Sequence, residues 1–188
     1  MLFLASKSPR RRQLLEQIGI DFDILDVDVP EVRAEGEPGI DYVSRVAREK
    51  AGAGLLQVVA VPGAIVMGAD TEVELDGEIF GKPTDATDAA AMLGRLSGRT
   101  HRVISVVWCV NAGKEDHVVS ISEVSMVPMD GATIDAYVAT GEAFGKAGAY
   151  AIQGRAAAFI SNLSGNYSGV MGLPLHETAL LLARFRGY

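Results

Sequence analysis

The chain has 188 residues, 48% of them hydrophobic, and a formal net charge of −7. This length suits one domain with its own core, so we expect residues 1–188 to form a single domain. The acidic balance disfavours a nucleic-acid partner, and the one cysteine excludes both an internal disulfide framework and a cysteine-based zinc site.

The N-terminus does not have the order of a signal peptide. Residues 1–5 are apolar and the basic residues follow them, whereas a signal peptide places its basic region first. No later apolar run approaches the length of a membrane span. The sequence therefore predicts a cytoplasmic location and no membrane partner.

Strands and helices alternate in the first part of the sequence. Ser8 suits a helix N-cap, Pro9 the first helical position and Gly19 the position after the helix end. Apolar runs and helical spacing predict these elements: a strand at residues 2–5, a helix from Pro9 to about residue 18, a strand at 22–25, a helix at 40–58 and a strand at 63–70.

Hairpins occupy the middle of the sequence, and the alternation returns at its end. Asp76-Gly77 between two apolar runs is typical of a hairpin turn. The further predicted elements are strands at 71–75 and 78–80, a helix at 85–96, strands at 103–111 and 117–127, a helix at 130–140, a strand at 156–162 and a helix at 174–185. We expect an α/β fold with a mixed sheet, with Cys109 in its core and His101 at a strand edge.

Hydroxyl and guanidinium side chains are concentrated at residues 6–11, between the first predicted strand and the first turn of the first predicted helix. A helix N-terminus attracts anions, and Ser6, Ser8, Arg10 and Arg11 would strengthen a phosphate site there. The alternative is a solvated basic helix start, and the local sequence leaves both open.

Asp70 ends an apolar strand, where α/β folds place ligands. Its carboxylate could hold Mg²⁺ or orient an attacking water, or it could be a turn residue. Glu31 is a candidate partner for the same cation. Lys82 and Lys146 lie in glycine-containing segments that do not have the spacing of a P-loop. Each lysine could still neutralise phosphate charge, or it could be an ordinary surface lysine.

The order of these motifs resembles the Maf family of nucleotide pyrophosphatases across nearly the whole chain. The matching segments are residues 4–11, 47–51, 68–71, 81–83, 96–101, 146–150, 152–154 and 170–174. Three positions depart from the family pattern: Gly145 and Gly169 replace an acid and an Asn or Ala that are common there, and Ala151 replaces a frequent Gly. The acid missing at Gly145 is one possible metal or water ligand.

The resemblance implies a fold shared with inosine-triphosphate pyrophosphatases, with helices flanking a mixed, elongated sheet and a cleft between two lobes. It implies hydrolysis of a nucleoside triphosphate between the α and β phosphates, with Mg²⁺ or Mn²⁺ as the divalent cation. It also implies a homodimer in the cytoplasm. Arg10, Thr71 and Gln153 match the subgroup that acts on dTTP and UTP, and the 7-methyl-GTP subgroup usually differs at all three positions.

On this resemblance we expect Arg10, Arg11, Lys50 and Lys82 to hold the triphosphate, with Ser6 and Ser8 also touching phosphate. Asp70 is expected to accept a proton from the attacking water or to bind the metal, and Glu31 to be a second metal carboxylate. Thr71 and Gln153 are expected to help select the base.

Other functions remain open at this point. The chain could bind nucleotides as a regulator of cell division without turnover, or it could remove a modified or non-standard nucleotide such as 7-methyl-GTP. A nucleic-acid binder that uses the N-terminal basic cluster is disfavoured by the acidic total.

Overall fold

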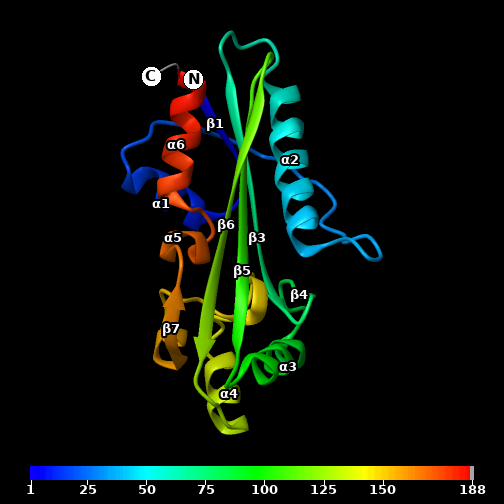
Figure 1. Cartoon of the computed structure of the whole chain (residues 1–188), viewed down its shortest axis with the longest axis vertical. Coiled ribbons are helices and arrows are strands. Elements are labelled where there is room, and N and C mark those ends of the chain that lie inside the picture. Colours follow the sequence, from blue (N-terminus) through cyan, green and yellow to red (C-terminus); the bar gives the residue numbers. More distant parts are fainter. Residues whose placement is uncertain (187–188) are drawn as a thin grey trace.

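A mixed seven-stranded sheet runs through the structure, a computed structural model that describes residues 1–186 (Figure 1). The strands are β1 (Leu2–Ala5), β2 (Asp23–Leu25), β3 (Ile65–Leu75), β4 (Glu78–Phe80), β5 (Thr100–Val110), β6 (Glu115–Met126) and β7 (Ile160–Ser164). They lie in the order β2-β1-β3-β5-β6-β7, and β4 also pairs with β3. β1 is parallel to both of its neighbours and the other pairs are antiparallel, which confirms the expected mixed α/β fold.

Helices cover both faces of this sheet (Figure 1). The helices are α1 (Pro9–Gln17), α2 (Gly39–Gln57), α3 (Ala86–Leu96), α4 (Gly131–Val138), α5 (Tyr167–Met171) and α6 (Leu175–Arg186). On one face, Val43 and Val46 of α2 pack against Ile104 and Val106 of β5. On the other face, buried side chains of α1 and α6 share a core with Cys109, as expected for that residue.

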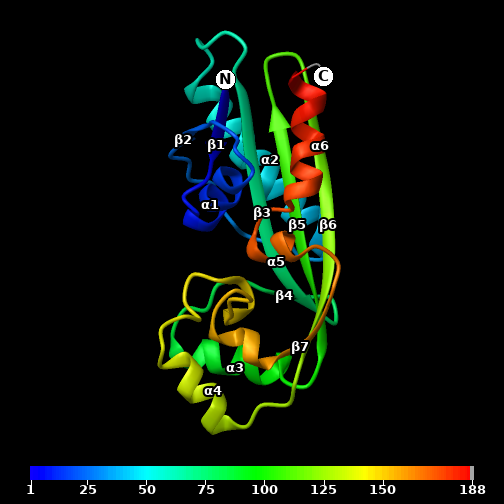
Figure 2. The same cartoon turned by 90° about the vertical axis from the view of Figure 1, so that its left-hand side faces the viewer.

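A second group of elements surrounds the far ends of the long strands (Figure 2). It consists of α3, α4, β4 and two short 3₁₀ turns, Ala147–Ala149 and Arg155–Phe159. These elements share a separate apolar core, in which Val73 of β3 meets Leu93 of α3 and Tyr150. The chain therefore has two lobes joined by β3, β5 and β6, as the family resemblance implies.

One edge of β3 is interrupted between the two lobes. β5 pairs with β3 along the opposite edge from Val66 to Glu74. On the interrupted edge, β1 pairs with β3 only up to Gly68, and β4 begins to pair at Val73. Residues 69–72 therefore have no strand partner on that side.

Gly68 lets α2 lie directly against β3. A Cβ atom at this position would come within 2.3 Å of the Ala47 carbonyl oxygen and 2.5 Å of the Ala51 nitrogen, both backbone atoms of α2. Only glycine accommodates this approach without moving the helix. The close contact matters for the site, because α2 also carries Lys50.

The structure corrects several sequence-based boundaries. The strands predicted at 63–70 and 71–75 are one continuous strand, β3, because its residues stay extended into the β4 hairpin. The strand predicted at 156–162 begins only at Ile160, since residues 155–159 form a 3₁₀ turn. Helix α5 was not predicted, because five residues are too few for a periodic signal.

His101 is not an edge residue, which corrects a further expectation. It is 2% exposed, and its Nε2 lies 2.7 Å from the hydroxyl of Tyr150. Tyr150 belongs to the other lobe's core and also lines the pocket described below. His101 therefore ties β5 to the segment that follows α4.

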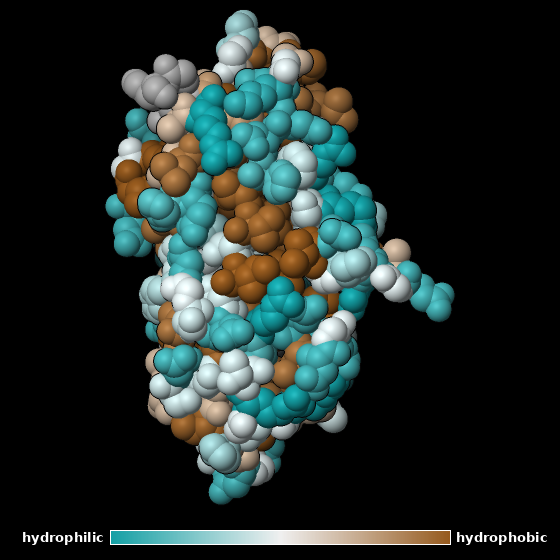
Figure 3. All heavy atoms as spheres, in the orientation of Figure 1, coloured by the Kyte–Doolittle hydropathy of each residue, from teal (hydrophilic) through white to brown (hydrophobic). Residues whose placement is uncertain are grey.

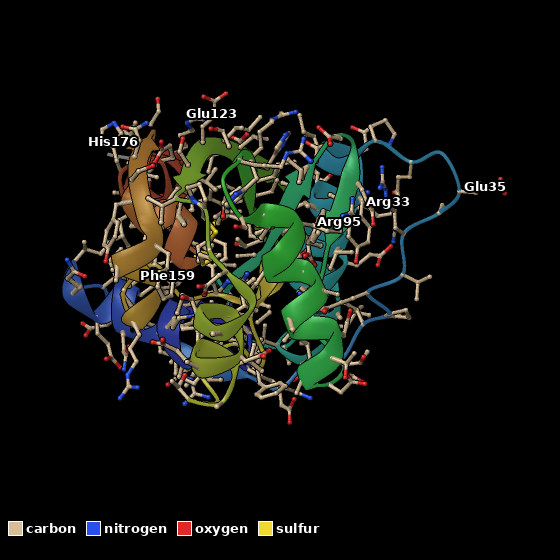
Figure 4. The ribbon with its side chains drawn as sticks, turned by 90° about the horizontal axis from the view of Figure 1, so that it is seen from below. Arg33, Glu35, Arg95, Glu123, Phe159 and His176 are labelled. Atoms are coloured by element: carbon tan, nitrogen blue, oxygen red, sulfur yellow. The ribbon has the colours of Figure 1, made fainter. Side chains whose placement is uncertain are left out.

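Two surface features stand out beyond the pocket. Apolar side chains gather in the middle of the face shown in Figure 3, and β6 leaves Val119 and Ile121 about 40% exposed. The loop between β2 and α2 projects from the body of the protein, with Glu35 near its tip (Figure 4). Within residues 1–186, no helix has the length and apolar character needed to cross a bilayer.

Gly68→Ala should destabilise the protein by about 1–3 kcal/mol, because the added methyl group meets rigid backbone rather than a flexible side chain. Gly52→Ala is the matched control within α2, since a Cβ there meets nothing within 4 Å. That control should be neutral or stabilising by about 0.5–1 kcal/mol. Urea unfolding measures both variants, and equal midpoints would contradict the close approach of α2.

The stability of the protein should depend on His101 at mildly acidic pH. Burial lowers the pKa of His101 from 6.5 to about 4. Between these two pH values, His101 binds a proton in the unfolded chain but not in the folded chain. The contribution of His101 to the free energy of unfolding is therefore complete above pH 6.5 and is lost as the pH falls toward 4. Urea unfolding over this range should show that the free energy of unfolding falls more steeply with decreasing pH for the wild type than for His101→Gln. Parallel curves would show that His101 does not titrate in this way.

Candidate active site

A pocket of about 930 Å³ lies over the unpaired edge of β3, between the two lobes. This volume is within the range of small-molecule sites. The pocket is lined by the β1–α1 loop, the loop before α2, residues 70–73 of β3, and residues from the segments 142–154 and 170–172. All ten sequence-predicted site residues line it: Ser6, Ser8, Arg10, Arg11, Glu31, Lys50, Asp70, Thr71, Lys82 and Gln153.

A buried lysine joins the two acids that the sequence could not place together. The ammonium group of Lys50 lies 2.6 Å from Oε1 of Glu31 and 2.7 Å from Oδ1 of Asp70. Lys82 reaches the other oxygen of Glu31 at 2.9 Å. Although burial opposes ionisation, the hydrogen bonds and charges of the two lysines lower the pKa of Glu31 to about 2. Glu31 is therefore a fixed negative charge at any physiological pH.

Asp70 keeps one oxygen free of protein partners. Its side chain is 7% exposed, and Oδ2 is buried without a hydrogen bond from any residue that the structure describes. Glu72, two residues further along β3, also has a buried and unpartnered oxygen, Oε2. Burial and the nearby charges of Asp70 and Glu31 raise the pKa of Glu72 to about 8. Oδ2 of Asp70 and Oε2 of Glu72 are therefore two oxygens of the pocket that accept no hydrogen bond from the described chain.

This donor set fits a divalent cation of the magnesium type. Within residues 1–186, no group of three or more His, Cys, Asp or Glu side chains is arranged to hold a metal ion. Mg²⁺ does not need one, because it usually takes one or two carboxylates and fills its other positions with water and substrate phosphate oxygens. The free Oδ2 of Asp70 is suited to this role, and Glu31 lies on the other side of Lys50.

The start of α1 presents free hydroxyl groups to the pocket. Ser8 occupies the N-cap position and Pro9 the first turn, as predicted, but the Ser8 side chain makes no capping hydrogen bond. Its hydroxyl is therefore available to a ligand. The Ser6 hydroxyl accepts a hydrogen bond from the Ser8 backbone at 3.2 Å and one from Arg11 at 3.4 Å, and its own proton remains free to bind an anion.

Arg11 lines the pocket and also forms hydrogen bonds to other parts of its wall. Its Nε donates to the Gly172 carbonyl oxygen at 2.8 Å, and another guanidinium nitrogen donates to the Thr71 hydroxyl at 3.3 Å. These bonds connect α1 to β3 and to the residue after α5. Arg11 is thus held in one orientation, which suits recognition of a phosphate group.

Arg10 and Lys146 form a second basic wall. No hydrogen bond or ion pair to Arg10 is present within residues 1–186, and the Lys146 ammonium donates only to the Phe144 carbonyl oxygen, at 3.2 Å. Burial and then the charge of Arg10 lower the pKa of Lys146. Glu142 is the acid near Lys146, but it forms no ion pair with either cation in the described chain, so both remain able to bind an anion.

The two residues expected to select the base have different surroundings. Thr71 faces away from Asp70, since neighbouring residues of a strand point to opposite faces, and its hydroxyl lies 2.8 Å from that of Ser105. Gln153 is exposed at the pocket and keeps its amide free of partners within the described chain. Gln153 is therefore the better placed of the two to meet a base.

The sequence reasoning missed several residues that shape the pocket. Glu72 follows Asp70 by two positions, so strand alternation was a signal that could have found it. Glu142 accepts two hydrogen bonds from the Arg155 backbone nitrogen and packs so closely on Gly154 that any side chain there would collide with it. Tyr150 lies in the segment 146–150 that matches the family, although its residue type indicates no role there. Nothing in the local sequence marks Glu142 as a pocket residue.

Comparisons with known proteins agree with this geometry. The profile of the family described as Maf-like protein matches residues 1–185. A dTTP/UTP pyrophosphatase from Xanthomonas euvesicatoria pv. vesicatoria (strain 85-10) is 56% identical over 187 residues, which cover 98% of each chain. A nucleoside triphosphate pyrophosphatase from Xylella fastidiosa (strain M23) is 55% identical over 186 residues, again 98% of each chain.

These matches cover the chain from the β1–α1 loop to α6, and they include every residue that lines the pocket. The resemblance inferred from the ordered motifs is confirmed, and the chain belongs to the Maf-like protein family.

Proposed function

We propose that the chain hydrolyses nucleoside triphosphates, dTTP and UTP before others, between the α and β phosphates. The products are the nucleoside monophosphate and pyrophosphate. The observation that carries this proposal is Lys50 held between Glu31 and Asp70, with Oδ2 of Asp70 left free in a pocket walled by basic side chains. The names of the two relatives give the substrate class.

The basic side chains account for binding of the triphosphate. Arg10 and Lys146 are free to meet phosphate oxygens from one wall, and the Ser8 hydroxyl and the N-terminus of α1 add neutral donors. Lys82 lies on the opposite side, next to Glu31. These groups are in place before the substrate arrives, so they offset the charge that develops on the pyrophosphate leaving group.

Asp70 is placed to handle the proton of the attacking water. Lys50 fixes one carboxylate oxygen, so the other keeps a constant direction. In the proposed step the water oxygen bonds to the α phosphorus, the bond from that phosphorus to the bridging oxygen breaks, and Oδ2 accepts the water proton. In the alternative role, Oδ2 of Asp70 would hold a divalent cation, Mg²⁺ or Mn²⁺, with Glu31 as a second carboxylate, and the cation would polarise phosphoryl oxygens and acidify bound water.

The base is proposed to lie near Gln153. Its amide both donates and accepts hydrogen bonds, as the edge of a pyrimidine base requires. Arg10, Thr71 and Gln153 together match the dTTP and UTP subgroup, which supports a preference for these nucleotides over 7-methyl-GTP. The homodimer, the cytoplasmic location and the absence of a nucleic-acid partner remain predictions from the sequence and the resemblance.

Pyrophosphate release from a panel of nucleotides tests the proposed substrate class. With Mg²⁺ or Mn²⁺, dTTP and UTP should give the highest kcat/KM of a panel that also contains CTP, dITP and 7-methyl-GTP. A best rate with 7-methyl-GTP would contradict the roles given to Arg10, Thr71 and Gln153. Binding of dTTP without any pyrophosphate release would instead favour a regulator without turnover.

Asp70→Asn should lower kcat for dTTP by at least about a hundredfold, because the amide cannot accept the water proton. The matched control is Asp76→Asn in the β3–β4 turn, whose exposed carboxylate pairs with Arg99. That control should keep wild-type activity. Both folds are checked by circular dichroism, and near-normal turnover in a folded Asp70→Asn protein would reject the assignment of Asp70.

A further inference from the structure

Glu72 is a buried acid of the pocket to which the proposed reaction gives no role. It is 6% exposed and lines the pocket, yet its Oε2 has no hydrogen-bond partner within the described chain. Buried polar groups are nearly always hydrogen-bonded, and an unpaired buried acid is costly to the fold. A buried carboxyl group without a partner therefore indicates a ligand that binds to it.

The nearby lysines do not satisfy Glu72. Lys50 bonds to Glu31 and Asp70, and Lys82 bonds to Glu31. Neither ammonium group forms an ion pair with Glu72 in the structure. No lysine of the pocket that bonds to Glu31 or Asp70 therefore pairs with the free Oε2 of Glu72 in the described chain.

The other orphaned oxygen of the pocket is Oδ2 of Asp70. Asp70 and Glu72 are two residues apart on β3, so their side chains point to the same face of the strand. Their Cα atoms are about 6–7 Å apart. Both also lie in the segment of β3 whose outer edge has no strand partner. At this separation the longer side chain of Glu72 could bring its carboxylate to an ion that is bound to Oδ2 of Asp70.

We propose that Glu72, together with Asp70, holds the divalent cation that accompanies the triphosphate. This inference rests on the proposed function. The cation would take one oxygen from each acid and fill its remaining positions with phosphate oxygens and water, which is the usual pattern for Mg²⁺.

Mn²⁺ binding tests this role without relying on turnover. The free Mn²⁺ signal in electron paramagnetic resonance gives the dissociation constant in the presence of a non-hydrolysable α,β-methylene analogue of dTTP. Glu72→Gln should weaken Mn²⁺ binding by about tenfold or more, since an amide cannot supply the carboxylate that Glu72 forms when the cation displaces its proton. Its midpoint in urea should not fall, because the substitution removes a buried unpaired acid.

Glu74→Gln is the matched control. Glu74 lies on the same face of β3, two residues beyond Glu72, but it pairs with Arg102 at 2.9 Å and does not line the pocket. This variant should bind Mn²⁺ as the wild type does. A loss of binding in Glu72→Gln alone supports the proposal.

Equal Mn²⁺ affinity in the wild type and Glu72→Gln would overturn the inference, as would the absence of Mn²⁺ binding in the wild type. Pyrophosphate release from dTTP by the same wild-type preparation tests the proposed function separately. Release combined with unchanged Mn²⁺ binding in Glu72→Gln rejects the role of Glu72 only. No release rejects the proposed function, whatever the binding result.

Discussion

The site depends on how the long strand β3 is paired. β5 follows one edge of this strand without a break, whereas β1 and β4 share the other edge and leave residues 69–72 between them without a partner. A continuous partner strand there would fill the pocket. The interruption instead opens the middle of the strand to a ligand, while β5 keeps that segment straight and rigid. Asp70 and Glu72 are therefore presented from a fixed backbone.

The approach of α2 to β3 supplies the second half of this arrangement. Gly68 has no side chain to separate the helix from the strand, so Lys50 of α2 reaches Asp70 directly. The lysine then draws in Glu31 from the loop before α2. A contact between backbone atoms, set by one glycine, thus determines the geometry of three charged side chains that lie far apart in the sequence.

The distribution of charge explains how an acidic protein can take an acidic substrate. The net charge is −7, yet Arg10, Arg11 and Lys146 line one side of the pocket. Asp70 and Glu72 lie on β3, and two lysines pair with Glu31 and Asp70 there. A triphosphate with its cation would match this division, with the phosphate oxygens at the basic wall and the cation at the acids.

Much of the fold could be predicted from the sequence, because apolar periodicity and turn residues act locally. The Ser8-Pro9 helix start and the Asp76-Gly77 turn are examples. The short helix α5 and the 3₁₀ turn before β7 could not, since neither is long enough for a pattern. The meeting of Glu31 with Asp70, the bracing of Arg11 by Gly172, and the buried pair of His101 and Tyr150 depend on tertiary packing. Local sequence does not record such contacts.

The central claim is that a nucleoside triphosphate and its cation bind against the unpaired edge of β3. A crystal structure of the wild-type protein with Mn²⁺ and a non-hydrolysable dTTP analogue tests it most directly, because Mn²⁺ is located by its anomalous signal. The account predicts Mn²⁺ beside Asp70, the phosphates between β3 and the wall of Arg10 and Lys146, and the base near Gln153. Nucleotide bound elsewhere, such as in the second hollow beside Trp108 and Arg48, would contradict it.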